Sequence, residues 1–159
     1  MDNHTKQDYI NSVDEDLLKF IELVLDGKDI KPITVGFVNA QMCAEIKSLT
    51  GLNTYGNRIV LGADDVRHIV KRHGEMGLAD HSMKDNRDIA RLCYVLSNYD
   101  SIEWDGGRSR LYRTSDGEFA PQIILKKRVN GTYYIIEVVS DSKKHRNVVT
   151  TAYLKKAEP

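Results

Sequence analysis

The sequence predicts an α+β fold in which N-terminal helices pack on a C-terminal antiparallel β-sheet. Apolar residues recur at helical spacing in several segments before residue 98. After that point, short alternating segments are separated by turn sequences. Asn130–Gly131 is the clearest of these, because this pair favours the type I′ turn of a β-hairpin. Helices followed by an antiparallel meander are typical of the α+β class.

Four helices are expected, each between a capping residue and a terminating residue. Ser12-Val13-Asp14-Glu15 has the pattern of a capping box, in which the Ser12 hydroxyl caps the helix and Glu15 reaches back. Glycine commonly ends helices and follows three of the four. The expected helices run from Ser12 to Gly27, from Asn39 to Gly51, from Asp64 to Gly74 and from about Asp85 to Asn98.

Short β-branched and alternating segments predict the strands. The turn sequence Asp105-Gly106-Gly107 indicates a hairpin between the segments on either side of it. The polar, glycine-broken stretch 75–84 predicts a flexible loop. The expected strands are residues 33–38, 59–61, 101–104, 108–114, 121–129, 132–139 and 147–154.

Composition indicates a folded domain without a membrane segment. The chain has 159 residues, of which 41% are apolar and 29% charged, so it can build a core without disulfides or a structural metal. Cys43 and Cys93 are expected to be buried apolar residues in a reducing compartment. No apolar stretch is long enough for a membrane helix, and no apolar leader core follows Met1. We therefore expect a cytoplasmic protein with no membrane partner.

Charge is unevenly distributed although the net charge is zero. Residues 1–30 carry a net charge of −5, whereas residues 107–159 carry +6. The basic C-terminal third can attract a phosphate backbone, or it can simply form a solvated sheet face.

Residues 66–74 hold the densest group of polar side chains, including His68, Arg72 and His73. Imidazole titrates near neutral pH and suits proton transfer. Zinc binding is less favoured, because helical zinc ligands lie four residues apart. His68 and His73 are five apart, roughly 140° around a helix. A purely structural alternative is that His73 caps the helix C-terminus.

The last expected strand offers two hydroxyl groups. Side-chain alternation places Val149, Thr151 and Tyr153 on one face, with Ala152 and Leu154 on the core face. The Thr151 and Tyr153 hydroxyls would then lie about 7 Å apart by strand rise, which suits two oxygens of a phosphate. The alternative is that threonine and tyrosine occur here only because both favour β-strands for packing reasons.

Lys126 and Lys127 end an apolar strand and point to opposite faces. At most one of them can therefore serve a given site as a fixed cation, and an edge-strand lysine that blocks aggregation is the alternative. The other candidates for substrate contact are Arg108, Arg110 and Arg113 as a basic track, with Tyr133 and Tyr134 as base-stacking rings or core residues.

The order of these features resembles the phage-type nucleases of the barnase, EndoU, colicin and RelE-like superfamily. The matching pieces are Ile59–Leu61, His68-Ile69 with His73-Gly74, Lys126, and Thr151-Ala152-Tyr153 followed by Lys155-Lys156. The resemblance covers about residues 58–156 and implies a barnase/EndoU-like arrangement of helices on an antiparallel sheet. Residues 1–57 have no counterpart, so we expect an acidic helical extension at 1–57 and a nuclease-like domain at 58–159, in one compact unit.

The resemblance also implies an endoribonuclease that uses no metal and no cofactor. The RNA 2′-hydroxyl would attack the adjacent phosphate and give a 2′,3′-cyclic phosphate. His73 and His68 match the family's helix histidines, Lys126 its sheet cation, and Thr151 with Tyr153 its last-strand pair. We expect Arg72, Arg110, Lys127 and Tyr134 to contact the RNA. Family members occur in phage and toxin systems, which implies an inhibitor or immunity protein as a further partner.

Two other functions fit the sequence. A non-catalytic phage accessory module could keep the fold and bind nucleic acid or protein, and the zero net charge favours it, because free ribonucleases tend to be basic overall. A metal-dependent nuclease would use His68, His73 and His81.

Overall fold

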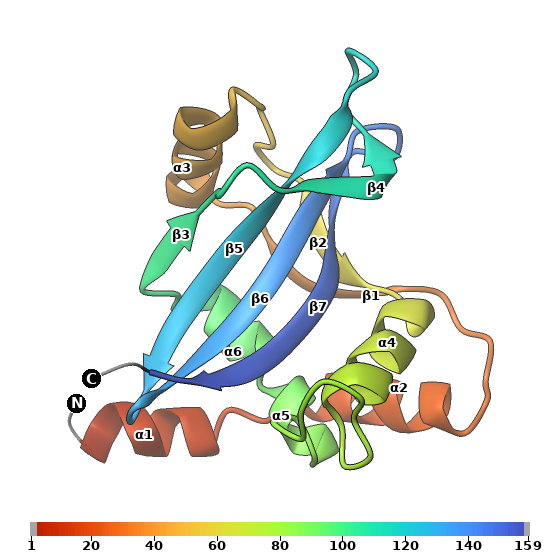
Figure 1. The fold of residues 1–159 in the computed structure, drawn as a ribbon, viewed down its shortest axis with the longest axis vertical. Coiled ribbons are helices and arrows are strands. Elements are labelled where there is room, and N and C mark those ends of the chain that lie inside the picture. The colour runs from red at the N-terminus through yellow and green to blue at the C-terminus, as the bar shows by residue number, and fades with distance from the viewer. Residues whose placement is uncertain (1–2, 158–159) are drawn as a thin grey trace.

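The computed structural model describes residues 3–157 and the side chains of residues 6–157. It confirms the α+β class, with helices packed against a seven-stranded sheet (Figure 1). The helices are α1 (Asn3–Ile10), α2 (Glu15–Leu25), α3 (Ala40–Thr50), α4 (Ala63–His73), α5 (Asn86–Ala90) and α6 (Leu92–Ser97). The strands are β1 (Ile33–Phe37), β2 (Arg58–Leu61), β3 (Ser101–Glu103), β4 (Arg108–Arg113), β5 (Phe119–Val129), β6 (Thr132–Asp141) and β7 (Arg146–Lys156). Among the described residues, no helix has the length and apolar character needed to cross a membrane.

The sheet has the strand order β1-β2-β7-β6-β5-β3, and β4 also pairs with β5. All pairs are antiparallel except β2 with β7, which is parallel. The β5–β6 hairpin turns at Asn130 and Gly131, whose φ angles are both positive, as a type I′ turn requires. This hairpin was predicted from the same two residues. Three long strands, β5, β6 and β7, therefore form the centre of the sheet.

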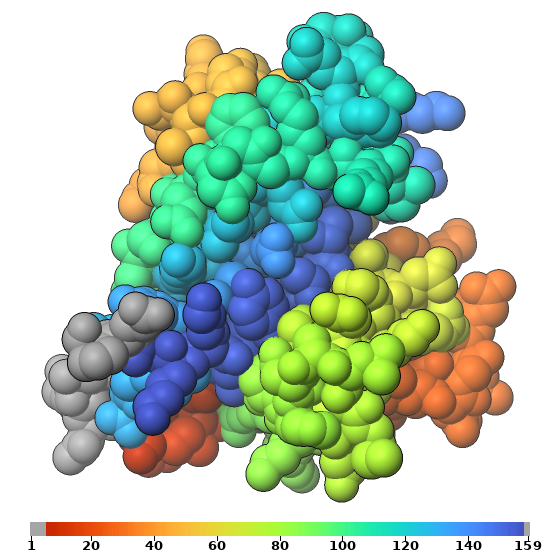
Figure 2. All heavy atoms as spheres, viewed as in Figure 1, coloured from red at the N-terminus to blue at the C-terminus, as the bar shows by residue number. Residues whose placement is uncertain are grey.

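One face of the central strands carries the core, and the other face is largely open. Tyr134, Ile136 and Val138 of β6 are buried on the core face together with the apolar sides of the helices. In Figure 1 α6 lies behind the central strands, on that face, and α5 lies below β7 in the view. Figure 2 shows the opposite face, where side chains of the central strands are visible between the β3–β4 segment and α4. A surface of this kind, walled on two sides, can hold a site.

Several predicted details are wrong. Asp14, not Ser12, caps α2 by accepting a hydrogen bond from the Leu17 amide, and the Ser12 hydroxyl donates to the Tyr9 carbonyl. The helix capped by Asp64 instead begins at Ala63, because Gly62 takes the extended N-cap conformation.

The single helix expected over residues 85–98 is two helices that meet at Arg91. Its side chain is held by Asp88 at 3.0 Å and by the Ile10 carbonyl at 3.3 Å. The expected hairpin around residues 105–107 does not form as such, because β3 and β4 each pair with β5 rather than with each other.

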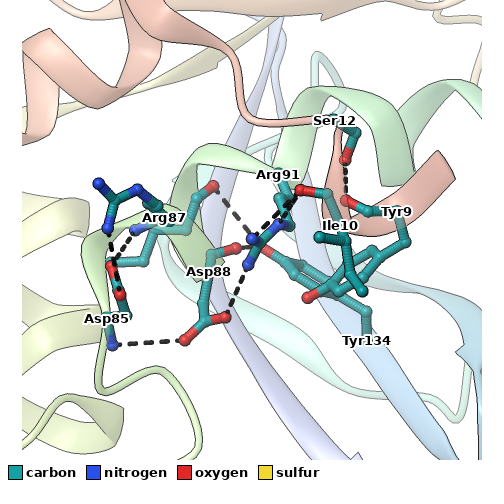
Figure 3. Close-up of polar contacts among 9 residues, drawn as sticks. Tyr9, Ile10, Ser12, Asp85, Arg87, Asp88, Arg91 and Tyr134 are labelled. Atoms are coloured by element: carbon teal, nitrogen blue, oxygen red, sulfur yellow. Dashed lines mark hydrogen bonds and ion pairs between the residues drawn. The ribbon is translucent and has the colours of Figure 1, made fainter. Parts of the chain in front are cut away.

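The first 57 residues contribute to the same structure in two ways. β1 extends the sheet by pairing with β2. α1, for which no helix was expected, is joined to α5 and β6 through a polar network shown in Figure 3. In that network, Arg91 bridges Asp88 and the Ile10 carbonyl, and the Tyr134 hydroxyl donates to the Asp88 carbonyl at 2.6 Å. The division of the chain at residue 58 stays a prediction.

Candidate active site

His73 is the last residue of α4, and its ring lies over the open face of β7. The imidazole stacks on the Tyr153 ring, with centroids 4.9 Å apart and an angle of 22° between the planes. Its Nδ1 atom lies 2.9 Å from a carboxylate oxygen of Asp80. The side chain is only 12% exposed. A ring held on one face and at one nitrogen has a fixed orientation, which leaves Nε2 for proton transfer.

The loop after α4 brings Asp80 to His73. The amide of Asp80 donates to the Arg72 carbonyl at 3.1 Å, and the amide of Met83 donates to the His73 carbonyl at 2.8 Å. Met83 is buried in the core, which anchors the far end of the loop. Gly77 permits the tight turn, because a Cβ atom there would collide with the carbonyl oxygens of Asp80 and Arg72. The stretch predicted to be flexible is thus tied back onto its own helix.

Asp80 is held in its ionised form. Burial opposes ionisation, but hydrogen bonds from the Ser82 amide and hydroxyl and from His73 outweigh it and keep the pKa of Asp80 below its ordinary value. Ser82 in turn accepts a hydrogen bond from the Leu154 amide at 3.1 Å, so the loop is also attached to β7. The negative charge of Asp80 is therefore placed where it stabilises a positive imidazolium.

A row of side chains crosses the open face from Tyr153 to Lys126. Lys126 of β5 pairs in register with Ile135 of β6, which pairs with Tyr153 of β7, so all three point to the same face. They line a pocket of about 440 Å³. Lys126 Nζ lies 2.9 Å from a carboxylate oxygen of Glu103, which also lines the pocket. The cation and the ring of Tyr153 thus face one space from either side of Ile135.

The next row holds Thr151 and Glu137. Glu137 of β6 pairs in register with Thr151 of β7, and a bulge at Thr150 follows. Because of this extra residue, Val149 turns into the core instead of sharing the face of Thr151, which corrects the simple alternation expected from the sequence. The Thr151 side chain is 8% exposed, and its hydroxyl has no hydrogen-bond partner in the described part of the chain. A buried hydroxyl without a protein partner is costly, so this group is a donor that the described residues do not use.

Glu137 is a half-buried carboxyl group beside these residues. Burial, followed by the charge of Asp105, raises its pKa above the ordinary value, and a hydrogen bond from Gln122 and the charge of His73 partly oppose this. The Gln122 amide donates to it at 2.8 Å. The carboxyl can therefore accept a proton at a pH closer to neutrality than an exposed glutamate can.

The histidines of α4 and the two substrate-binding arginines occupy different places. His68 is exposed on α4, and its pKa is lowered by partial burial, Arg72, His73 and Lys71, in that order. Arg72 is exposed beside His73. Arg110 lies on β4, which pairs with the start of β5 near Pro121, five residues along the strand from Lys126. The structure thus places His73 against Tyr153, Tyr153 and Lys126 along one pocket, and Thr151 in the adjoining row of the same face. His68 and Arg72 are exposed on α4, and Arg110 lies apart on β4.

Lys127 and Tyr134 point to the core face of the sheet, away from His73. Lys127 is 9% exposed, lies 3.5 Å from Asp100 and sits over the Tyr94 ring. Tyr134 is fully buried and packs edge-on against Tyr9 (Figure 3). Their register explains this, because both alternate with Lys126 and Ile135. We do not include them in the candidate site.

Sequence reasoning missed Asp80 and Glu137. Glu137 carries a visible signal, since it is a single carboxylate in the apolar run Ile135-Ile136-Glu137-Val138-Val139. Asp80 carries none, because its role depends on how the loop folds back. Among the described residues, no three His, Cys, Asp or Glu side chains form a group that could hold a metal ion, and His68, His73 and His81 form no such set.

Together, these groups can move protons around a bound phosphate ester. His73 and Glu137 are each able to take up and release a proton, and Lys126 and Tyr153 line the pocket with groups that can donate to phosphate oxygens. A histidine, a cation and hydroxyls on one face of an antiparallel sheet are groups that suit chemistry on a phosphodiester.

The chain belongs to the family described as phage-Barnase-EndoU-ColicinE5/D-RelE like nuclease3, whose model matches residues 37–158. This match confirms the resemblance inferred from the sequence. It begins at residue 37, earlier than residue 58, where the resemblance was expected to begin. The chain matches no curated protein and no solved structure.

Proposed function

We propose that this protein is an endoribonuclease that cleaves RNA by attack of the 2′-hydroxyl and uses no metal ion. The single observation that supports it best is the grouping of His73, Tyr153, Lys126 and the unpartnered Thr151 hydroxyl on one sheet face. Such a group can bind a phosphate and assist proton transfer with protein groups alone.

The reaction would proceed in one concerted or stepwise displacement at phosphorus. The RNA 2′-oxygen forms a bond to phosphorus and loses its proton to Glu137, whose pKa is raised. The bond from phosphorus to the 5′-oxygen breaks, and that oxygen takes a proton from His73 Nε2. We assign the acid role to His73 because Asp80 is placed to stabilise its protonated form. The products are a 2′,3′-cyclic phosphate and a 5′-hydroxyl.

Charge builds on the two non-bridging oxygens during this displacement. Lys126 and the hydroxyls of Thr151 and Tyr153 would donate to them. Burial, followed by the charges of Glu137 and Asp80, raises the pKa of Tyr153, so its hydroxyl keeps its proton and remains a donor at neutral pH. DNA would not be cleaved, because it lacks the attacking hydroxyl.

The test compares cleavage of single-stranded RNA and of DNA of the same sequence, in the presence of a chelator. We expect RNA cleavage with a cyclic phosphate end, loss of activity in His73→Ala, and normal activity in the control His81→Ala, since His81 is exposed on the same loop. Activity that disappears with chelator, or that survives in His73→Ala, contradicts the proposal.

The second candidate function is a non-catalytic module that binds nucleic acid or protein. The zero net charge of the chain favours it. Salt-dependent RNA binding without any cleavage would support this alternative.

A further inference from the structure

A third row of side chains lies on the open face beyond Tyr153 and Lys126. Arg128 of β5 pairs in register with Tyr133 of β6, which pairs with Lys155 of β7. These three residues are each two positions from Lys126, Ile135 and Tyr153, so the rows are about 7 Å apart by strand rise. Neighbouring phosphates of an extended nucleic acid strand have a comparable separation.

The chemistry of this row differs from that of the two rows described above, the row of Tyr153 and Lys126 and the row of Thr151 and Glu137, which we call the catalytic rows. The Tyr133 ring lines the same 440 Å³ pocket and is half-buried. The Lys126 ammonium and the Arg128 guanidinium each lie 6.0 Å from its centroid. Within residues 6–157, neither Arg128 nor Lys155 forms an ion pair with an acidic side chain, whereas Lys126 pairs with Glu103. The row therefore combines an aromatic face with two cations that have no acidic partner among the side chains of residues 6–157.

The two ends of the pocket also differ in charge. Glu103 and Asp105 line the pocket at one end, where the register also places Glu137, and Lys155 and Lys156 line it at the Tyr133 end, where the register also places Arg128. A polyanion that enters the pocket is repelled at the first end and attracted at the second. The strand of a bound substrate should therefore leave the catalytic rows over Tyr133.

We propose that Tyr133, Arg128 and Lys155 form a binding subsite for the nucleotide next to the scissile phosphate. Its base stacks on the Tyr133 ring, and its outer phosphate contacts Arg128 and Lys155. A base can stack on the ring only when it is unpaired, so the substrate class is single-stranded RNA. Stacking uses the π-face that every base has, so this subsite tolerates sequence. The inference rests on the proposed function and adds the substrate class to it.

The experiment measures binding separately from cleavage. The probe is a fluorescent hexauridylate with 2′-O-methyl groups, which has no free attacking hydroxyl, and the readout is anisotropy at several salt concentrations. We expect Tyr133→Ala to weaken binding about tenfold and Tyr133→Phe to leave it unchanged, because the ring and not the hydroxyl is needed. Tyr55→Ala is the matched control, since Tyr55 is 70% exposed on another part of the surface. Arg128→Ala and Lys155→Ala should each reduce the salt slope by about 1.

Three results would overturn the subsite: equal binding by Tyr133→Ala and wild type, equal loss in Tyr133→Phe and Tyr133→Ala, or no binding by wild type. If Tyr133→Ala does not fold, Arg128→Ala and Lys155→Ala still test the subsite. Salt slopes that are unchanged in both of these variants would also overturn the subsite. Wild-type protein that binds the probe but never cleaves unmodified RNA would refute the ribonuclease and retain the subsite. If the wild-type protein cleaves RNA and Tyr133→Ala binds the probe as well as the wild type does, the ribonuclease is retained and the subsite is refuted.

Discussion

The imidazole of His73 and the phenol ring of Tyr153 lie against each other, with their centroids 4.9 Å apart. One ring ends a helix and the other belongs to the last strand, so the contact joins parts of the chain that are far apart in sequence. Asp80 holds the imidazole from a second side at 2.9 Å. These two contacts set the direction of the remaining ring nitrogen.

Asp80→Ala should lower RNA cleavage about tenfold to 100-fold, because the imidazole loses the carboxylate that orients it and stabilises its positive charge. Asp80→Asn keeps a hydrogen-bond acceptor without the charge, so its activity should lie between those of Asp80→Ala and the wild type. Initial rates on one RNA measure this order. Asp80→Ala with wild-type activity would show that His73 needs no partner.

Lys126 and Lys127 are neighbours in sequence with opposite expected effects. Lys126→Ala should lower cleavage about 100-fold, since one donor to the phosphate oxygens is lost. It should change the unfolding free energy by less than about 0.5 kcal/mol, since its ion pair with Glu103 is partly exposed to solvent. Lys127→Ala should keep activity but lose about 1–2 kcal/mol of stability, because its buried stem packs on the core face. Rates and urea denaturation of both variants measure this. A reversed pattern would place the wrong lysine at the site.

Thr151 and Thr150 give a second matched pair. Thr151→Val removes a buried hydroxyl without a partner, so the unfolding free energy should rise by about 1 kcal/mol while cleavage falls about 100-fold. The Thr150 hydroxyl donates to the Glu137 carbonyl at 3.2 Å, so Thr150→Val should lower the unfolding free energy by about 1 kcal/mol. Thermal or urea denaturation with parallel rate measurements tests both. A destabilised Thr151→Val would mean that this hydroxyl already has a partner.

The sequence predicts features that depend on interactions between residues close together in the chain, and it does not predict features that depend on contacts between distant segments. Asn130–Gly131 specifies its turn locally, and the Asn39 cap of α3 and the strand position of Tyr153 also depend on near neighbours. The orientation of Thr151 was predicted correctly, but Val149 was misplaced because the bulge at Thr150 is a property of the β6–β7 pair.

Long-range contacts explain the residues that sequence reasoning missed or placed elsewhere. Asp80 reaches His73 only because a loop folds back on hydrogen bonds to Arg72 and His73 carbonyls. Tyr134 pairs in register with Lys127, and that register places both opposite the site. Nothing in the local spacing of either residue encodes which face the helices will cover.

Glu137→Gln tests the assignment of the base through pH dependence. The pKa of Glu137 is raised, so cleavage should decline as pH falls through this raised pKa and the carboxylate becomes protonated. In Glu137→Gln, this acidic decline should disappear and the remaining rate should be at least about 100-fold lower. Values of kcat/KM between pH 4 and pH 8 measure it. An unchanged acidic limb in the variant would assign the proton acceptor to another group.

Glu137→Gln also has an expected effect on stability that distinguishes chemistry from misfolding. A folded-state pKa above the unfolded one means that the ionised carboxylate opposes folding once the pH exceeds both values. The variant should therefore be at least as stable as wild type at pH 7. Lower stability at that pH would attribute its lost activity to folding instead.

Asp65 provides a prediction on stability away from the catalytic rows. Burial raises its pKa from 3.8 to about 6, with a smaller raising effect of Asp64, against a hydrogen bond from Gly62 and the charge of Arg146. Because the folded state binds this proton more tightly, its stabilising effect is complete below the unfolded pKa of 3.8 and is lost as the pH rises through about 6. Asp65→Asn should remove this dependence and raise the unfolding free energy at pH 7.5 by about 1–2 kcal/mol, since the group keeps some solvent contact.

Urea denaturation at pH 4 and pH 7.5 measures this, as the difference between variant and wild type at each pH. The control is Asp64→Asn, because the neighbouring Asp64 side chain is 99% exposed and its 2.9 Å ion pair with Arg67 lies on the surface. That variant should change the unfolding free energy by less than about 0.5 kcal/mol. Equal effects of the two substitutions, or an Asp65→Asn gain that persists at pH 4, would show that the burial of Asp65 does not penalise its ionised form.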